Sequence, residues 1–309
     1  MTSIVKENEL GPLGYRIHAN PNSNGSVSEC VKKEKPDIIF HLAAQSIVSE
    51  SFSNPIGTIK TNTLGSTNIL ESVKKNKIKN LVFITSDKCY LNKNTNKPYK
   101  EKDLLGGHDI YSSSKAAAEI LFHSYHDSFF ILQAKNLKKV TARAGNVIGG
   151  GDFKINRVIP DFFRSIIKKK KLVIRNPLAT RPWQHVLEPL SGYLILGEKI
   201  LNNKLKNNLY PSWNFGPHKK NCKKVREIID SFYGELGLNK NYNIKKNFRL
   251  KEAQLLSLDI SKAKKELNWE PRLSLDECIV LTSNWYINYI SGESSERITE
   301  EQIEFYENK

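Results

Sequence analysis

The chain has 309 residues and a formal net charge of +16 at pH 7, a length that accommodates one large α/β unit or two domains. No apolar run approaches the roughly 20 residues of a membrane-spanning helix, and residues 1–9 lack the apolar segment of a signal peptide. The four cysteines, Cys30, Cys89, Cys222 and Cys278, form no Cys-x-x-Cys pair. This usage is typical of free thiols in the reducing cytoplasm, and it argues against a metal site.

The positive charge is carried mostly by lysine, because only 10 of the 48 basic residues are arginine. The lysine runs at 74–75, 168–171 and 223–224 come at the ends of expected elements and are not interleaved with aromatic residues, as a nucleic-acid stacking surface would be. We therefore expect no nucleic-acid partner and no membrane partner. A positive field does favour anionic small molecules.

Apolar runs alternate with amphipathic segments between residues 26 and 144. The expected strands are 37–44, 81–84 and 139–144, and the expected helices are 26–35, 64–75 and 111–125. Strands that alternate with helices predict a parallel, Rossmann-like α/β sheet with right-handed crossovers. In such sheets ligands bind at the carboxyl ends of the strands, and polar motifs follow Ala43, Ile84 and Ala144 at those ends.

The pattern changes at about residue 153, where segments shorten and aromatic residues become more frequent. We expect residues 1–152 to form a partial Rossmann domain and residues 153–309 to form mainly a smaller substrate-binding lobe, with some segments returning to the sheet. An amphipathic helix is expected over 274–289, and residues 291–309 have the composition of an acidic surface tail.

The most informative motif is Tyr111-Ser-Ser-Ser-Lys115, which follows the expected strand 81–84 and its polar continuation, Thr85-Ser-Asp-Lys88. A tyrosine and a lysine one helical turn apart share a face. There the ammonium group can lower the pKa of the phenol, so that the tyrosinate can take a proton from an alcohol. A second match to this spacing, Tyr242 and Lys246, we interpret as accidental.

Structural explanations compete with functional ones at several positions. Asp87 and Lys88 could form only a surface ion pair, and residues 149–152 could be only a glycine-rich turn. Trp183 and Trp213 are as compatible with a core as with ligand contacts. We assign no chemistry to His41.

Several motifs together resemble the extended short-chain dehydrogenase/reductase superfamily. They are His41-Leu-Ala-Ala-Gln45, Asn62 with Gly65, Tyr111-x-x-x-Lys115 and Arg143-Ala-Gly-Asn-Val-Ile-Gly149. The strings 85–90, 144–152, 174–177 and 181–193 narrow this resemblance to the CDP-glucose 4,6-dehydratases, over about residues 36 to 309. The resemblance implies a Rossmann domain, NAD as the cofactor, and conversion of CDP-glucose to CDP-4-keto-6-deoxyglucose and water.

The resemblance also implies a role for each catalytic residue. Tyr111 would remove the 4-hydroxyl proton, and Lys115 would hold the nicotinamide ribose and lower the pKa of Tyr111. Ser86 would hydrogen-bond the 4-oxygen, and Asp87 would protonate the leaving 6-hydroxyl. Lys88 would take the proton from C5, which a lysine can do only in its neutral form.

The binding residues follow from the same resemblance. Those expected to line the cofactor, besides Tyr111 and Lys115, are Ala43, Ala44, Gln45, Asn62 and Thr85. Those expected to contact the sugar nucleotide are Asn146, Arg157, Arg175, Arg181 and Asn214. The resemblance further implies a cytoplasmic enzyme of deoxysugar and surface-polysaccharide (O-antigen) synthesis. It also implies a homodimer formed through helices 64–75 and 111–125.

One part of the superfamily pattern is missing. A glycine-rich loop between a first strand and a first helix normally holds the pyrophosphate, whereas only 40 residues precede His41, and neither Gly11-x-x-Gly14 nor Gly25 is expected to follow a strand or open a helix. We therefore expect an N-terminally truncated chain. The alternatives to an active dehydratase are an inactive sugar-nucleotide-binding remnant and another NDP-sugar epimerase or dehydratase.

Overall fold

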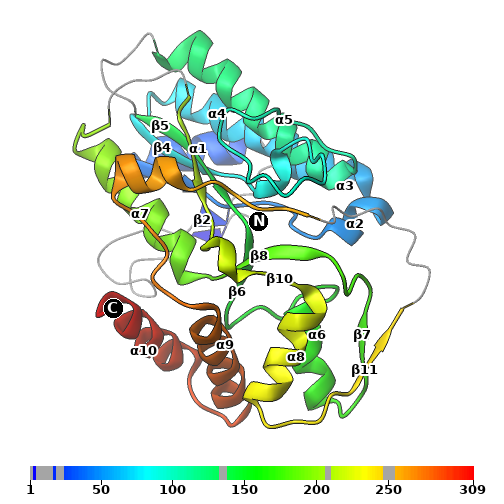
Figure 1. The fold of residues 1–309 in the computed structure, drawn as a ribbon. Helices are drawn as coiled ribbons and strands as arrows, with labels where there is room; N and C mark the ends of the chain where they lie inside the picture. The colour runs from blue at the N-terminus through cyan, green and yellow to red at the C-terminus, as the bar shows by residue number, and fades with distance from the viewer. Residues whose placement is uncertain (1–2, 5–16, 19–23, 132–137, 206–209, 246–254) are drawn as a thin grey trace. The chain divides into compact units, whose positions relative to one another are not determined.

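The computed structural model describes residues 3–4, 17–18, 24–131, 138–205, 210–245 and 255–309 (Figure 1). These residues fall into two compact units, each discontinuous in sequence. The first comprises 1–91, 104–142 and 196–212, and the second comprises 92–103, 143–195 and 213–309. The predicted division of roles at residue 152 stays a prediction, because these units are defined by packing alone.

A sheet with parallel strands confirms the predicted α/β class; β3 and β4 belong to the first unit, and β5 and β9 have residues in both units. The strand order is β3-β4-β5-β9, and β3, β4 and β5 run parallel. The predicted strands correspond to β3 (Ile38–His41), β4 (Asn80–Ile84) and β5 (Lys139–Ala144), while β9 is Ser212–Phe215. His41 is in register with Phe83, and Ile84 with Ala142. The carboxyl ends of these strands therefore lie at one edge of the sheet.

The helices of this unit include the predicted ones, and several are extended by short or π-helical turns. They are α1 (Asn24–Glu34), α2 (Val48–Ser53), α3 (Pro55–Ile59), η2 (Lys60–Leu64), α4 (Gly65–Lys75), η3 (Asp87–Cys89), α5 (Ile110–Tyr125) and η4 (His126–Phe130). Two-residue strands, β1 (Ser3–Ile4) and β2 (Ile17–His18), pair antiparallel. The apolar faces of α1, α4 and α5 bury Val31, Leu70 and Phe122 in one core with Phe83 of the sheet.

Two expectations for this unit were wrong. Gly25 lies in the first turn of α1, so it does open a helix, whereas Gly11 and Gly14 lie outside the described residues. The apolar composition of the expected strand 37–44 is typical of a buried parallel strand, yet Ile38, Ile39 and Phe40 are only partly buried, and Leu42 beyond β3 is 51% exposed. The reason is that β3 ends the strand order of the described sheet, so its pairing in that sheet is with β4 alone.

The second unit consists of short strands and helices around an aromatic core. Its elements are β6 (Asn146–Ile148), α6 (Val158–Ile167), β7 (Leu172–Ile174), β8 (Thr180–His185), η6 (Lys219–Asn221), β10 (Cys222–Lys224), α8 (Val225–Glu235), β11 (Tyr242–Ile244), η7 (Ala263–Leu267), α9 (Leu275–Ile290) and α10 (Ser295–Glu307). Helix α7 (Leu187–Leu201) begins here and ends in the first unit.

Helix α9 begins at Leu275, one residue after the predicted start, with Ser274 as its capping residue, and the acidic tail forms α10. Tyr242 lies on strand β11, and Lys246 lies outside the described residues. Among the described residues no helix is long and apolar enough to cross a membrane.

Candidate active site

A tight turn at the end of β4 organises the predicted catalytic triplet. The Thr85 N–H donates to the Ala142 carbonyl at 2.9 Å, which extends the sheet by one bond. The Ser86 hydroxyl then accepts from Lys88 N–H at 3.3 Å and donates to Asp87 Oδ1 at 3.0 Å, so it caps the 3₁₀ turn η3. The turn thereby fixes Ser86, Asp87 and Lys88 with respect to the sheet.

Asp87 and Lys88 do not form a surface ion pair. Asp87 is fully buried, and Lys88 Nζ lies 3.6 Å from its Oδ1 with about a fifth of the lysine side chain exposed. The other carboxylate oxygen, Asp87 Oδ2, is buried without a hydrogen-bond partner among the described residues. An orphaned buried carboxylate oxygen is costly in a protein without a ligand, so Oδ2 is suited to a group that binds there.

Tyr111 and Lys115 lie on α5, as the spacing predicted. Asp109 caps this helix by accepting from the Ser112 N–H at 2.9 Å and from its hydroxyl at 2.7 Å. Both Tyr111 and Lys115 are only 6% exposed. Burial lowers the pKa of Lys115 from 10.5 to about 8, against the opposing influence of Cys89 and Glu119. Helix α5 packs on η3, so the two predicted catalytic motifs are neighbours in this unit.

The loop that follows β3 is held to α5 by side-chain amides. Gln45 N–H donates to Asn62 Oδ1 at 2.8 Å, and Asn62 Nδ2 donates to the Gln45 carbonyl at 2.9 Å and to Ser114 Oγ at 3.0 Å. Asn62 is 1% exposed, whereas Ala43 is exposed and Ala44 partly so. Among the predicted cofactor residues, Gln45 and Asn62 therefore hold the loop in place by hydrogen bonds. Ala43 and Ala44 are small and leave the surface of the loop accessible.

A buried carboxylate was missed by the sequence analysis. Glu119 is 0% exposed and accepts hydrogen bonds from the hydroxyls of Thr85 and Thr141, the latter at 3.1 Å. Tyr111, Lys115 and Glu119 are spaced by four residues, so they share one face of α5. This spacing is the signal that could have identified Glu119.

His41 has the structural role that was expected of it. It is 5% exposed, its Nε2 lies 3.3 Å from Ser66 Oγ, and its ring lies 4.9 Å from that of Phe83. Burial, together with the charge of Lys115, lowers its pKa to about 3. The ring is therefore neutral at physiological pH.

The predicted substrate residues lie in the second unit, where two of them are on adjacent strands. Asn146 on β6 is in register with Trp183 on β8, two residues after Arg181. Asn146 Oδ1 is buried without a hydrogen-bond partner among the described residues. Arg181 is 4% exposed, and its Nη1 donates to the Thr180 carbonyl at 3.0 Å. The orphaned oxygen makes Asn146 suited to a ligand contact.

Arg157 and Arg175 converge on one loop, residues 152–157. Arg157 Nη1 lies 2.6 Å from Asp152 Oδ2, and Arg175 donates to both the side chain and the carbonyl of Asn156, at 3.2 and 2.7 Å. Asn156 has a left-handed backbone with φ of 67°. These two arginines therefore shape the loop in this structure.

Asn214 and the two tryptophans belong to the core of the second unit. Asn214 is 0% exposed, and its amide donates to the carbonyls of Tyr99 and Asp259 at 2.9 and 3.1 Å. Trp183 and Trp213 are 2% and 0% exposed. The turn at 149–152 packs closely on α9, because a Cβ at Gly150 would lie 1.9 Å from the Trp285 ring. Each of these residues has a structural role.

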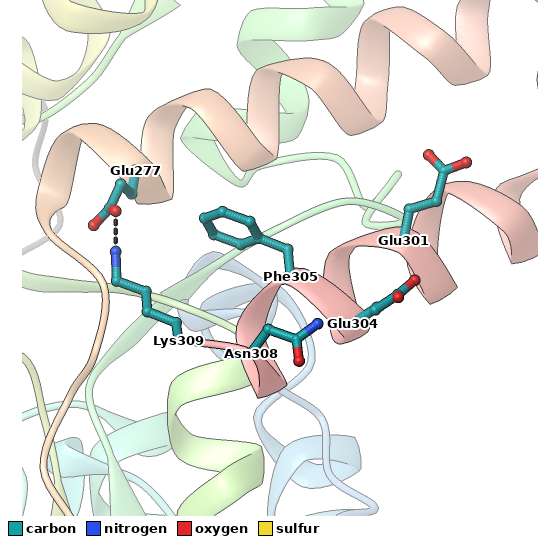
Figure 2. A pocket seen from close by; sticks show the side chains of 6 residues that line it. All are labelled: Glu277, Glu301, Glu304, Phe305, Asn308 and Lys309. Carbon is teal, nitrogen blue, oxygen red and sulfur yellow. Dashed lines mark hydrogen bonds and ion pairs between the residues drawn. The ribbon is translucent and has the colours of Figure 1, made fainter.

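A separate hollow of about 520 Å³ opens on α9 and α10 (Figure 2). It is lined by Glu277, Glu301, Glu304, Phe305, Asn308 and Lys309. Lys309 pairs with Glu277 and, mainly through that hydrogen bond, lowers its pKa to about 2. This hollow contains none of the predicted site residues, and its carboxylates disfavour an anionic ligand.

Comparison with known proteins identifies the class of this chain. A family model described as GDP-mannose 4,6 dehydratase matches residues 16–282. The chain is 40% identical over 276 residues to CDP-glucose 4,6-dehydratase of Salmonella typhimurium, with 88% of this chain and 76% of the relative covered. It is 27% identical over 255 residues to UDP-glucuronate 4-epimerase of Thermodesulfobacterium geofontis, with 80% and 71% covered.

Solved structures share the fold. The dTDP-glucose 4,6-dehydratase of Bacillus anthracis in complex with NAD superimposes with a TM-score of 0.74 at 22% identity, covering 93% of this chain and 85% of that one. The UDP-glucose 4-epimerase of Thermotoga maritima with UDP-glucose gives a TM-score of 0.77 at 22% identity, covering 88% and 84%. The chain belongs to the GDP-mannose 4,6-dehydratase family. The resemblance found in the sequence is thereby confirmed.

Proposed function

We propose that this protein catalyses the 4,6-dehydration of a nucleoside-diphosphate hexose with NAD, and that its substrate is CDP-glucose. The observation that carries this proposal is the Ser86-Asp87-Lys88 turn, in which the buried Asp87 has an Oδ2 without a partner among the described residues and an Oδ1 that faces both Ser86 Oγ and Lys88 Nζ. A simple epimerase does not need an acid and a base at this place. The choice of CDP-glucose rests on the 40% identical relative.

The residues of the first unit fit the nicotinamide end of NAD. Ala43 and Ala44 leave the surface of the loop after β3 accessible, while the Gln45–Asn62–Ser114 bonds hold that loop to α5 next to Lys115. We assign Thr85, Tyr111 and Lys115 to the same end. When bound there, the cofactor supplies a hydride acceptor that later returns the hydride.

The proton transfers fall to the protein side chains. Tyr111 takes the 4-hydroxyl proton while Ser86 hydrogen-bonds the 4-oxygen. Lys88, in its neutral form, takes the C5 proton, which the adjacent ketone acidifies, and Asp87 gives a proton to the departing 6-hydroxyl. Lys88 then returns its proton to C5 of the product.

These transfers leave Tyr111 with one proton more and Asp87 with one proton fewer after each turnover. A proton must therefore pass from Tyr111 to Asp87, directly or through solvent, before the next cycle. Ser86 Oγ donates to Asp87 Oδ1 at 3.0 Å, so we assign Ser86 to the Asp87 end of this route.

We assign substrate contacts to Asn146, Arg157, Arg175 and Arg181, and an indirect role to Asn214. Asn146 has the orphaned oxygen, and an arginine fork matches the geometry of a diphosphate. Asn214 already uses both donor positions within the protein, so it supports the unit that carries the contacts.

We further propose a cytoplasmic homodimer that feeds deoxysugar and surface-polysaccharide (O-antigen) synthesis. Ile120 on α5 and Leu64, just before α4, are apolar residues that are 51% and 54% exposed, and we assign them to the proposed dimer interface. Light scattering after size-exclusion chromatography would give twice the mass of 35.3 kDa for a dimer.

The decisive experiment is mass spectrometry of the purified protein incubated with CDP-glucose and NAD. The proposal requires a sugar nucleotide lighter by one water. UDP-glucose and dTDP-glucose, incubated in parallel, separate the reaction type from the choice of nucleotide. If none of the three sugars loses water, the dehydratase assignment is wrong for this chain.

A further inference from the structure

The strongest feature outside the assigned residues is the carboxylate of Glu119, which joins the two elements of the catalytic centre. Thr85, which donates to it, is the last residue before Ser86 at the end of β4. Glu119 itself lies on α5, one turn beyond Lys115 and two turns beyond Tyr111. The hydrogen bond from Thr85 therefore connects the strand that carries the Ser86–Lys88 turn to the helix that carries Tyr111 and Lys115.

The network around Glu119 extends to β9. Thr141 Oγ1 on β5 lies 3.1 Å from Glu119 Oε2 and 2.8 Å from Ser212 Oγ. His123 Nε2 lies 3.6 Å from Glu119 Oε2 and 3.2 Å from Ser212 Oγ. Glu119, Thr141 and Ser212 are all 0% exposed. A fully buried carboxylate is tolerated only where such partners satisfy it.

We propose that Glu119 is a positioning residue for the dehydration: its carboxylate fixes the Ser86–Lys88 turn relative to Tyr111 and Lys115, and its charge offsets the burial of the Lys115 ammonium group. This inference rests on the proposed function for its kinetic consequences, whereas the link between Glu119 and Lys115 stands without it.

Several titratable groups influence the charge of Lys115. Burial lowers the pKa of Lys115, and Cys89 from η3 and Glu119 from α5 both raise it. From β3, His41 is neutral at physiological pH, and the charge of Lys115 helps to keep it so. Removal of the Glu119 charge therefore lowers the pKa of Lys115 below about 8, and Lys115 loses its proton at a lower pH.

The kinetic test compares Glu119→Gln with Glu119→Asp and Thr141→Val. We expect Glu119→Gln to lower kcat at least tenfold, with KM for CDP-glucose changed less than threefold, and to move the alkaline limb of the kcat profile to lower pH. Glu119→Asp keeps the charge but is shorter by one methylene. The alkaline limb of its kcat profile should therefore lie at the wild-type pH, while kcat itself stays reduced. Thr141→Val removes a buried hydrogen bond of the same network but leaves Thr85 bound, so it should lower the melting temperature and keep kcat and the limb.

A kcat profile unchanged in Glu119→Gln would overturn the proposal. So would equal kinetic losses in Thr141→Val and Glu119→Gln, because they would reduce Glu119 to a general packing role. A reduced kcat with a shifted alkaline limb in Glu119→Gln, together with a normal kcat in Thr141→Val, would support the proposal.

A second test does not need activity. In a double-mutant cycle with Lys115→Met, the unfolding equilibrium in urea at pH 7 should show at least tenfold coupling between positions 115 and 119. If the wild-type protein converts no sugar nucleotide, the proposed function is wrong, but this cycle still shows whether Glu119 and Lys115 interact. Additive effects of the two substitutions on the unfolding equilibrium would refute the interaction between Glu119 and Lys115, whatever the activity.

Discussion

Lys115 combines a predicted catalytic role with an unfavourable position, so replacing it should separate activity from stability. Its side chain is 6% exposed, and burial lowers its pKa to about 8. We predict that Lys115→Met abolishes turnover and raises the free energy of unfolding at pH 7. Methionine is unbranched and of similar length, so it can fill the same space without a charge.

The magnitude and the sign follow from the two pKa values. The difference between 10.5 and about 8 corresponds, at 1.36 kcal/mol per pH unit, to about 3 kcal/mol of penalty for the charged form. Below pH 8 both the folded and the unfolded chain carry the proton, so the full penalty is present. Between pH 8 and 10.5 the unfolded chain binds more protons, so the stability of the wild-type protein rises with pH through this window.

Urea unfolding of both proteins at pH 7, 8, 9 and 10 tests this reasoning. The gain from Lys115→Met should be up to about 3 kcal/mol at pH 7 and should shrink toward zero near pH 10.5. Lys170→Met, at an exposed lysine, provides the control and should change stability by less than about 0.5 kcal/mol at every pH. A Lys115→Met protein that is less stable at pH 7, or whose gain does not depend on pH, would refute the assignment of Lys115 as a buried, desolvated ammonium group.

Three further predictions concern the reaction and the fold. Tyr111→Phe removes the proposed base, so product formation measured by mass spectrometry should fall by at least about a hundredfold; a near-normal rate would exclude Tyr111 as the base. Lys88→Met should still allow oxidation at C4 but block loss of water, so NADH absorbance at 340 nm should accumulate without the dehydrated sugar, and appearance of that sugar would exclude Lys88. Tyr306→Phe removes a hydroxyl that donates to the buried Glu188 at 2.8 Å, and we expect a loss of about 1.5–3 kcal/mol in the free energy of unfolding, with an unchanged value arguing against this contact.

The three parallel strands β3, β4 and β5 could be predicted because each was recognised as a short run followed by a polar motif, whereas β9 was not predicted. Lys139–Ala144 was predicted with its observed bounds, and 81–84 was one residue short. The partial exposure of β3 could not be predicted from its composition. Apolar residues do not reveal how many neighbours a strand has in its sheet, and β3 ends the described strand order.

The candidate site was predicted residue by residue from motifs, but motifs do not show which side chains face a ligand and which hold the backbone. Asn62 and Asn214 illustrate the difference, since both amides form hydrogen bonds within their own unit. Asn62 is 17 residues from its partner Gln45 in the sequence, and Asn214 is 115 residues from its partner Tyr99. No local pattern signals such bonds, which depend on the tertiary fold.

Glu119 is an intermediate case, because its position relative to Lys115 is visible in the sequence while its burial is not. A glutamate on a helix is usually solvated, whereas this one is buried and accepts hydrogen bonds from the hydroxyls of Thr85, just after β4, and Thr141, within β5. The same carboxylate counteracts the desolvation of Lys115, the group whose burial carries the largest predicted stability effect. The stability test of Lys115 measures the cost of burying its ammonium group, and the kinetic test of Glu119 measures how far the carboxylate offsets that cost. A loss of the pH-dependent gain in Lys115→Met would also remove the basis for the shifted kcat profile in Glu119→Gln.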